Sequence, residues 1–251
     1  MSTRWHIGAK QLRGAVAAYA KRFDLLEVRV AVAGESAESD GAASPALATL
    51  RRWRRSVPPS FDFAVVAGSQ LARVRPGDDA ERELEAAKAA IDVLHARCFV
   101  LRTPPEVTPA AIWRDRIAKL ASRFPRDVTH FVWEPGGVWE VEDAAGLARA
   151  CNAVLAVDPA REVVPVGPTA YLRLRALGET RSFSPATLER IVSAVGPRRE
   201  VFVIIETDSA LVEAKRLRSL VRRMRSATTG SSARALRSRV GGIVVRDDEQ
   251  E

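Results

Sequence analysis

Charged residues stand at or just beyond the C-terminal ends of several short apolar runs, where ionised side chains are costly unless they are paired. They are Glu27, Arg29, Arg102, Glu134, Asp158, Arg173, Arg175, Glu206 and Asp208. A guanidinium binds a phosphate or carboxylate through parallel hydrogen bonds, so Arg173 and Arg102 are predicted to clamp an anion. Glu134 and Glu206 could act as acid and base, or hold a divalent metal.

Glu27, Glu134 and Arg173 are the candidate catalytic residues, because each lies at the end of a different apolar run. The candidate ligand contacts are Arg29, Arg102, Arg175, Glu206 and Trp139. Trp139 fits a stacking wall for a ring-shaped ligand and core packing equally well. The alternative for the charged set is an internal salt-bridge layer that plugs the fold. No cofactor is predicted apart from the divalent metal that the carboxylates could hold.

Eight short apolar runs indicate the strands that would position these residues. Several are apolar throughout, which is typical of parallel strands covered on both faces by helices. The predicted strands are Trp5–Ala9, Leu25–Ala33, Phe63–Gly68, Cys98–Thr103, Phe131–Glu134, Ala153–Val157, Thr169–Leu174 and Val201–Glu206.

Helical periodicity fills most of the gaps between the strands. The predicted helices are Gln11–Phe23, one opened by Ser44-Pro45, Asp78–Leu94, Pro109–Phe124, Glu142–Ala150 and Ser184–Val195. Ser44 and Ser184 are predicted N-caps, each followed by a proline at the first helical position. The connection from Asp158 to Pro168 has no clear helical pattern.

This alternation over 251 residues predicts one α/β domain, a (β/α)₈ TIM barrel. An open doubly wound sheet is the alternative, and the absence of a glycine-rich phosphate fingerprint after the first strand counts against it. The active site of a TIM barrel lies at the C-terminal ends of its strands. The charged residues are therefore expected to meet at the barrel mouth.

The net charge of +8 is concentrated near the C-terminus. Nine basic and no acidic residues lie between Lys215 and Arg239, and the first 214 residues carry only +2. The barrel composition therefore does not predict nucleic-acid binding. Residues 1–226 are expected to form the barrel domain, ending in a helix over 215–225 with Leu217, Leu220, Val221 and Met224 packed inward. Residues 227–251 are expected to form a flexible tail, basic then acidic.

Cys98 and Cys151 belong to no C-x-x-C pair and are predicted to be buried thiols. The first residues do not resemble a secretory signal, and no apolar run approaches the ~20 residues that a membrane span needs. These observations predict a cytoplasmic protein without a membrane partner.

The basic run Arg51-Arg52-Trp53-Arg54-Arg55 is predicted to lie on a helix. Its four arginines would lie on the outer face, with Trp53 packed inward. A nucleic-acid patch is the alternative interpretation.

An ordered series of short motifs resembles the YecE-like family, domain of unknown function seventy-two, whose members are (β/α)₈ barrels. The resemblance extends over residues 4 to 224. The motifs are Trp5-His6-Ile7-Gly8, Tyr19–Phe23 with Leu26-Glu27-Val28, Leu50–Phe63 with Trp53, Pro58, Phe61 and Phe63, Leu101–Pro105, Phe131–Glu134 with Trp139, and Tyr171–Leu174.

The chain departs from the family pattern at several polar positions. Val66 replaces a lysine, Arg102 a glutamine, Arg175-Ala176 a histidine–glycine pair and Glu206-Thr207-Asp208 a pair of asparagines. The resemblance implies no particular reaction, because the family has no settled one. These departures predict an altered polar site.

Two hypotheses for function follow. The first is a hydrolase or binding protein for a phosphorylated or sugar-like small molecule at the barrel mouth. The second is a non-catalytic scaffold that docks a protein partner through its C-terminal tail, where Val240–Val245 is a short apolar stretch suited to strand addition.

Overall fold

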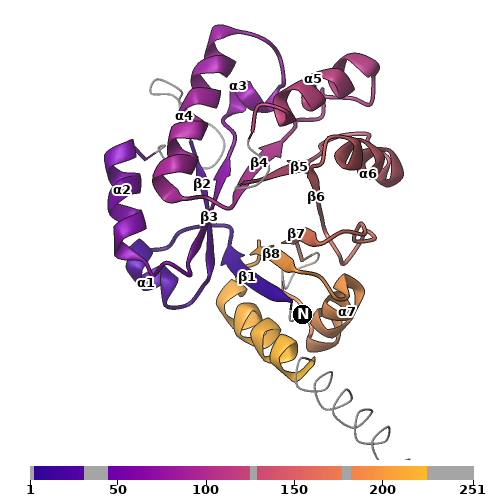
Figure 1. Cartoon of the computed structure of the whole chain (residues 1–251). Coiled ribbons are helices and arrows are strands. Elements are labelled where there is room, and N and C mark those ends of the chain that lie inside the picture. The colour runs from indigo at the N-terminus through magenta and orange to yellow at the C-terminus, as the bar shows by residue number, and fades with distance from the viewer. Residues whose placement is uncertain (1–2, 31–44, 125–128, 177–181, 225–251) are drawn as a thin grey trace, which may run out of the picture.

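The computed structural model describes residues 3–30, 45–124, 129–176 and 182–224. Eight parallel strands form a closed barrel in chain order, and β8 pairs with β1 from Arg4–Glu200 to Ala9–Ile205. Figure 1 shows the helices arranged around the outside of these strands. The predicted (β/α)₈ barrel is confirmed.

All eight predicted strands are present, with ends shifted by a few residues at most. They are β1 (Arg4–Ala9), β2 (Leu25–Arg29), β3 (Asp62–Val66), β4 (Cys98–Arg102), β5 (His130–Glu134), β6 (Val154–Val157), β7 (Thr169–Leu174) and β8 (Glu200–Ile205). Their near-continuous apolar character suits burial on both faces.

Most helices lie within a few residues of the predicted ranges. They are α1 (Val16–Ala20), α2 (Leu47–Ser56), α3 (Ser69–Ala72), α4 (Asp78–Leu94), α5 (Ala111–Ala121), α6 (Val141–Ala150) and α7 (Pro185–Val195), followed by a helix over residues 210–224. Ser184 caps α7 as predicted, its hydroxyl accepting a bond of 3.1 Å from the Thr187 amide.

Four details of the predicted helices need correction. α1 is much shorter than Gln11–Phe23, because Gly14 has a positive φ of 77° and Ala15 is extended. The N-cap of α2 is Ala46, two residues after the predicted Ser44. The four-residue helix α3 was not predicted, since one turn is too short to show a period.

Met224 is 44% exposed although it was expected to pack inward, whereas Leu217, Leu220 and Val221 are buried.

The connection between β6 and β7 contains no helix, in agreement with its irregular sequence. The Arg198 guanidinium holds this segment, donating to the carbonyls of Gly167 at 3.0 Å and Val164 at 3.4 Å. It also donates to the Val195 carbonyl at the end of α7, at 2.8 Å. A few hydrogen bonds thus substitute for the packing of a helix.

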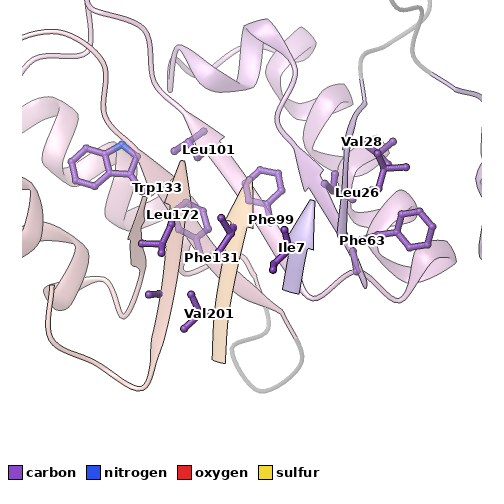
Figure 2. Packing of buried hydrophobic residues seen from close by; sticks show 14 of the residues in the cluster. Ile7, Leu26, Val28, Phe63, Phe99, Leu101, Phe131, Trp133, Leu172 and Val201 are labelled. Atoms are coloured by element: carbon purple, nitrogen blue, oxygen red, sulfur yellow. The ribbon is translucent and has the colours of Figure 1, made fainter. Parts of the chain in front are cut away.

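The outward faces of the strands pack against the helices and form the main core. Leu26, Phe63, Phe99, Trp133 and Leu172 belong to it (Figure 2). Both cysteines are buried, as predicted, and neither forms a disulfide within the described residues. Burial raises the pKa of the Cys98 thiol well above its ordinary value, which makes it unreactive.

The inward faces of the strands form a second, smaller core inside the barrel. It consists of Leu25, Ala64, Val66, Cys98, Val100, Val132, Ala156, Tyr171, Phe202 and Ile204. Because side chains alternate along a strand, the inward positions before and after this apolar layer carry polar groups at the two barrel ends. The barrel is therefore a packed body and contains no pore.

The predicted tail, residues 227–251, lies outside the described residues. In the described part of the chain, no helix combines the length and apolar character that crossing a bilayer requires.

The closure between β1 and β2 depends on one tyrosine. These strands approach closely at Gly8, where a Cβ atom would lie 2.3 Å from the Leu25 carbonyl oxygen. The buried Tyr19 hydroxyl accepts a hydrogen bond of 2.7 Å from the Ala9 amide and donates one of 2.9 Å to the Leu25 carbonyl. It thus bridges the two strands from α1.

We expect Tyr19→Phe to lower the free energy of unfolding by about 1–3 kcal/mol, because the buried Ala9 amide would lose its partner. Urea unfolding followed by circular dichroism measures this. A loss below about 0.5 kcal/mol, within the range of ordinary surface substitutions, would show that the bridge does not stabilise the closure.

Candidate functional site

Arg173 lies at the centre of a network of ion pairs at the C-terminal mouth. It projects from β7 into the barrel, and its side chain is only 1% exposed. Nη2 and Nη1 contact the two Glu27 carboxylate oxygens at 2.5 and 3.1 Å, and Nη1 contacts Glu206 at 2.8 Å. Nε donates to Glu134. One guanidinium therefore joins carboxylates from β2, β5 and the residue after β8.

Two further arginines close the outer side of the network. Arg175 donates from Nη2 to Glu134 and from Nε to Glu206 at 3.2 Å. Arg102 Nε lies 3.1 Å from Glu134, its neighbour in the β4–β5 register. The side chains of Arg102 and Arg175 are 34% and 35% exposed. They are the cations of the network that face solvent.

The network comprises three carboxylates and three guanidinium groups, so its formal charges balance. The structure brings together the three catalytic candidates Glu27, Glu134 and Arg173, as the run-end pattern predicted. It also brings in Arg102, Arg175 and Glu206. Arg173 itself is enclosed by carboxylates, which leaves Arg102 and Arg175 better placed than Arg173 to contact an anion.

The arginines hold the carboxylates in their ionised form. Burial alone would raise the pKa of Glu134, but Arg173, Arg102 and Arg175 outweigh burial and leave that pKa below its ordinary value. The pKa of Glu206 is lowered in the same way, against burial, by Arg173 and Arg175. Both groups are therefore acceptors at neutral pH, which does not suit the role of general acid.

Two further residues belong to the mouth, Tyr171, which was not predicted, and Asp158, which was expected there as a charged run-end residue but was not named as a site residue. Tyr171 donates its hydroxyl to Glu27 at 2.5 Å from the apolar layer below. Asp158, directly after β6, is buried, and burial raises its pKa, with Ala160, Arg161 and Arg175 opposing the effect. Its position after an apolar run was visible in the sequence, but the burial that perturbs it depends on tertiary contacts.

Two predicted ligand contacts lie apart from the network. Trp139 donates to the Val107 carbonyl at 2.6 Å and packs edge-on against Trp133, with ring centroids 4.8 Å apart. Arg29 is exposed at the end of β2, and within the described residues it makes no ion pair with the network. These contacts favour core packing for Trp139 over a stacking wall for a ligand.

The sequence suggested that the mouth carboxylates could hold a divalent metal, and the described residues do not support this. Within the described ranges, no group of three or more histidine, cysteine or carboxylate side chains has metal-binding geometry. The physical reason is that Glu27, Glu134 and Glu206 each direct their oxygens at arginines.

A cavity of about 520 Å³ opens beside the network, between the loops that follow β1 and β8. Glu206 belongs to both the network and this cavity. Buried Tyr19, Phe23 and Ile205 line it, together with the exposed Lys10, Arg13, Arg22 and Asp208. The cavity thus combines an apolar surface with several cations at the end of the barrel where TIM-barrel sites lie.

The model of one protein family, described as "Protein of unknown function DUF72", matches residues 42–237. The chain belongs to the DUF72 family. This agrees with the YecE-like resemblance of its motifs. Among curated protein sequences, none matches the chain.

Solved structures of DUF72 proteins share the fold at low identity. One from Enterococcus faecalis is 14% identical with a TM-score of 0.65, covering 88% of this chain and 98% of its own. One from Thermotoga maritima is 15% identical with a TM-score of 0.64, covering 87% and 99%. A xylose isomerase domain containing protein from Salmonella typhimurium is 16% identical with a TM-score of 0.52, covering 90% and 97%.

We expect Arg173→Ala to lower the free energy of unfolding by about 3–5 kcal/mol, because three buried carboxylates would lose their shared cation. Thermal and urea unfolding measure the loss. Arg29→Ala is the matched control, since it removes an arginine from the end of another strand, β2, outside the network. Equal stability of Arg173→Ala and Arg29→Ala would contradict the arrangement.

The lowered pKa values of Glu134 and Glu206 also determine how the stability of the fold depends on pH. A carboxyl group whose folded pKa is depressed contributes its full stability above its unfolded pKa and loses it as the pH falls through the folded pKa. We therefore expect the free energy of unfolding to fall below about pH 4.5, and to fall less steeply in Glu206→Gln. Urea unfolding at a series of pH values tests this. Identical slopes for the two proteins would argue against the ionised Glu206.

Proposed function

We propose that this DUF72 barrel binds a small, anion-bearing, sugar-like molecule at its C-terminal mouth. The observation that carries the proposal is the placement of Arg102 and Arg175. Both are about a third exposed, and both contact the buried Glu134. Arg175 also contacts Glu206, which lines the 520 Å³ cavity. Guanidinium groups fixed in this way bind phosphate or carboxylate oxygens without a further loss of side-chain freedom.

The donors that remain on these arginines support this assignment. Arg102 uses Nε for Glu134, and Arg175 uses Nε and Nη2 for Glu206 and Glu134. Each guanidinium group has five N–H donors, more than these contacts use. Donors of this kind next to carboxylate acceptors match the alternating acceptors and donors of a polyhydroxylated ligand.

Asp158 is the mouth residue suited to proton transfer within this proposal. Its raised pKa brings the carboxyl closer to neutral pH, whereas those of Glu134 and Glu206 are lowered. A hydrolase would use Asp158 as its acid–base group, with the arginines binding the charged end of the substrate.

The fold neighbours are compatible with a sugar-like ligand. They include the xylose isomerase domain containing protein and a D-tagatose 3-epimerase-like protein, the latter with a TM-score of 0.52 and 12% identity. Likeness at this identity shows the fold alone, so the ligand class rests on the residues of the mouth. A cytoplasmic location is part of the proposal, because the free thiols of Cys98 and Cys151 suit a reducing compartment.

Isothermal titration with a panel of pentose and hexose phosphates, and with the same sugars unphosphorylated, tests the proposal. We expect at least one sugar phosphate to bind saturably, and Arg175→Gln and Arg102→Gln each to weaken it about 10-fold or more. Arg52→Gln, an exposed arginine on α2, is the control and should bind as the wild type does. Absence of saturable binding across the panel, or an equal effect of Arg52→Gln, would refute the proposal.

A further inference from the structure

A second polar region lies at the opposite, N-terminal end of the barrel. An open cavity of about 400 Å³ there is lined by three arginines, Arg4, Arg54 and Arg97. Its other lining residues are Val57, Pro59, Phe61, Asp62 and His95. None of these residues takes part in the ion network of the mouth, so this cavity lies outside the site proposed above.

Arg54 is the residue that first points to a ligand. The sequence pattern placed it on the outer face of α2 with Arg51, Arg52 and Arg55, and for Arg54 that prediction is wrong. Its side chain turns under the helix, donating from Nη1 to the Phe61 carbonyl at 2.9 Å and from Nη2 to the Pro58 carbonyl at 2.5 Å. The guanidinium carbon lies 5.3 Å from the centroid of the Phe63 ring.

This guanidinium is held in place by two neutral backbone carbonyls. In the part of the chain that the structure describes, Arg54 forms no ion pair. Partial burial lowers its pKa, and the charge of Asp62 opposes that effect only in part. An anion in the cavity would compensate the half-buried charge.

The two neighbouring arginines add positive charge to the same cavity. Arg4 is exposed at the start of β1, and among the described residues its side chain makes no ion pair. Arg97 is 31% exposed and contacts the two Glu200 oxygens through Nη2 at 2.7 and 2.8 Å. Its Nε and Nη1 are left for other acceptors.

The acidic groups at this end are already engaged. Asp62 lies 2.5 Å from Nδ1 of the buried His6, and Glu200 also lies 3.3 Å from His130 Nε2. Asp62 is the single carboxylate that lines the cavity, against three guanidinium groups. The balance of charge around the cavity is therefore positive.

We propose that this cavity is a binding site for the phosphate group of a small molecule. Arginines bind phosphate oxygens through paired N–H donors, and three converging guanidinium groups match the charge and the several oxygens of a phosphate. A volume of about 400 Å³ lies within the range of small-ligand sites. The cations converge on one cavity and do not follow an extended stripe, which favours a small anion over a nucleic-acid backbone.

Titration calorimetry with inorganic phosphate and with pyrophosphate, at constant ionic strength, tests this site. Because the mouth also contains arginines, each titration is made in the wild type and in an Arg175→Gln background. We expect one saturable site for pyrophosphate that Arg175→Gln leaves intact, with affinity reduced about 10-fold or more by Arg54→Gln and by Arg4→Gln. The matched control Arg52→Gln removes the same charge from the outer face of α2 and should leave the affinity unchanged.

Arg4→Gln guards against a misfolded Arg54→Gln protein, because Arg4 is exposed and outside any helix. Circular dichroism verifies the fold of each variant. The site is refuted by an absence of saturable binding in the wild type, by an effect of Arg52→Gln equal to that of Arg4→Gln, or by full affinity in Arg4→Gln. If Arg175→Gln were the only variant to lose binding, the anion would bind at the mouth. That result would refute the second site and agree with the proposed function.

Discussion

A buried guanidinium in the barrel interior sets a strict condition on this fold. Moving an ion from water into a protein interior costs several kcal/mol, and only well-placed counter-ions offset that cost. Arg173 meets the condition with Glu27 from β2, Glu134 from β5 and Glu206 beyond β8. The barrel must therefore close with the strands in one register, since a slip of one residue would turn a carboxylate to the outer face.

The same condition explains how the mouth is organised for binding. The inner part of the network is buried, and Arg173 contacts three carboxylates there. Arg102 and Arg175 stand on this base and retain exposure to solvent. Rigid support of partly exposed donors is what a binding site needs, because little side-chain freedom is then lost on association. The carboxylates that stabilise the fold are thus the same ones that would support the proposed binding site.

The two ends of the barrel differ in their balance of charge, although the same apolar layer lies between them. At the mouth, arginines and carboxylates balance. At the N-terminal end, histidines engage Asp62 and Glu200 at 2.5 and 3.3 Å, and the arginines around the cavity outnumber the carboxylate that lines it. Phe202 separates the ends, stacked on His6 with ring centroids 4.7 Å apart. The molecule therefore offers two chemically distinct polar surfaces on one rigid body.

The sequence by itself determined the elements and the ends of strands where charge collects. Continuous apolar runs predicted β1 to β8, periodicity predicted α4 from Asp78 to Leu94, and Ser184-Pro185 predicted the start of α7. These signals are local, because a period or a cap involves residues a few positions apart. The run ends also predicted that Glu27, Glu134 and Arg173 would meet.

Only the tertiary structure decided which charge faces which partner. Glu27 and Arg173 are 146 positions apart, and no local pattern states that they share two hydrogen bonds across the barrel. Burial of Arg173, exposure of Arg175 and the inward turn of Arg54 follow from where the barrel wall runs, and so do the pKa directions of Glu134 and Asp158. The physical reason is that desolvation and Coulomb energies depend on three-dimensional distance and enclosure, which strand and helix periodicities do not encode.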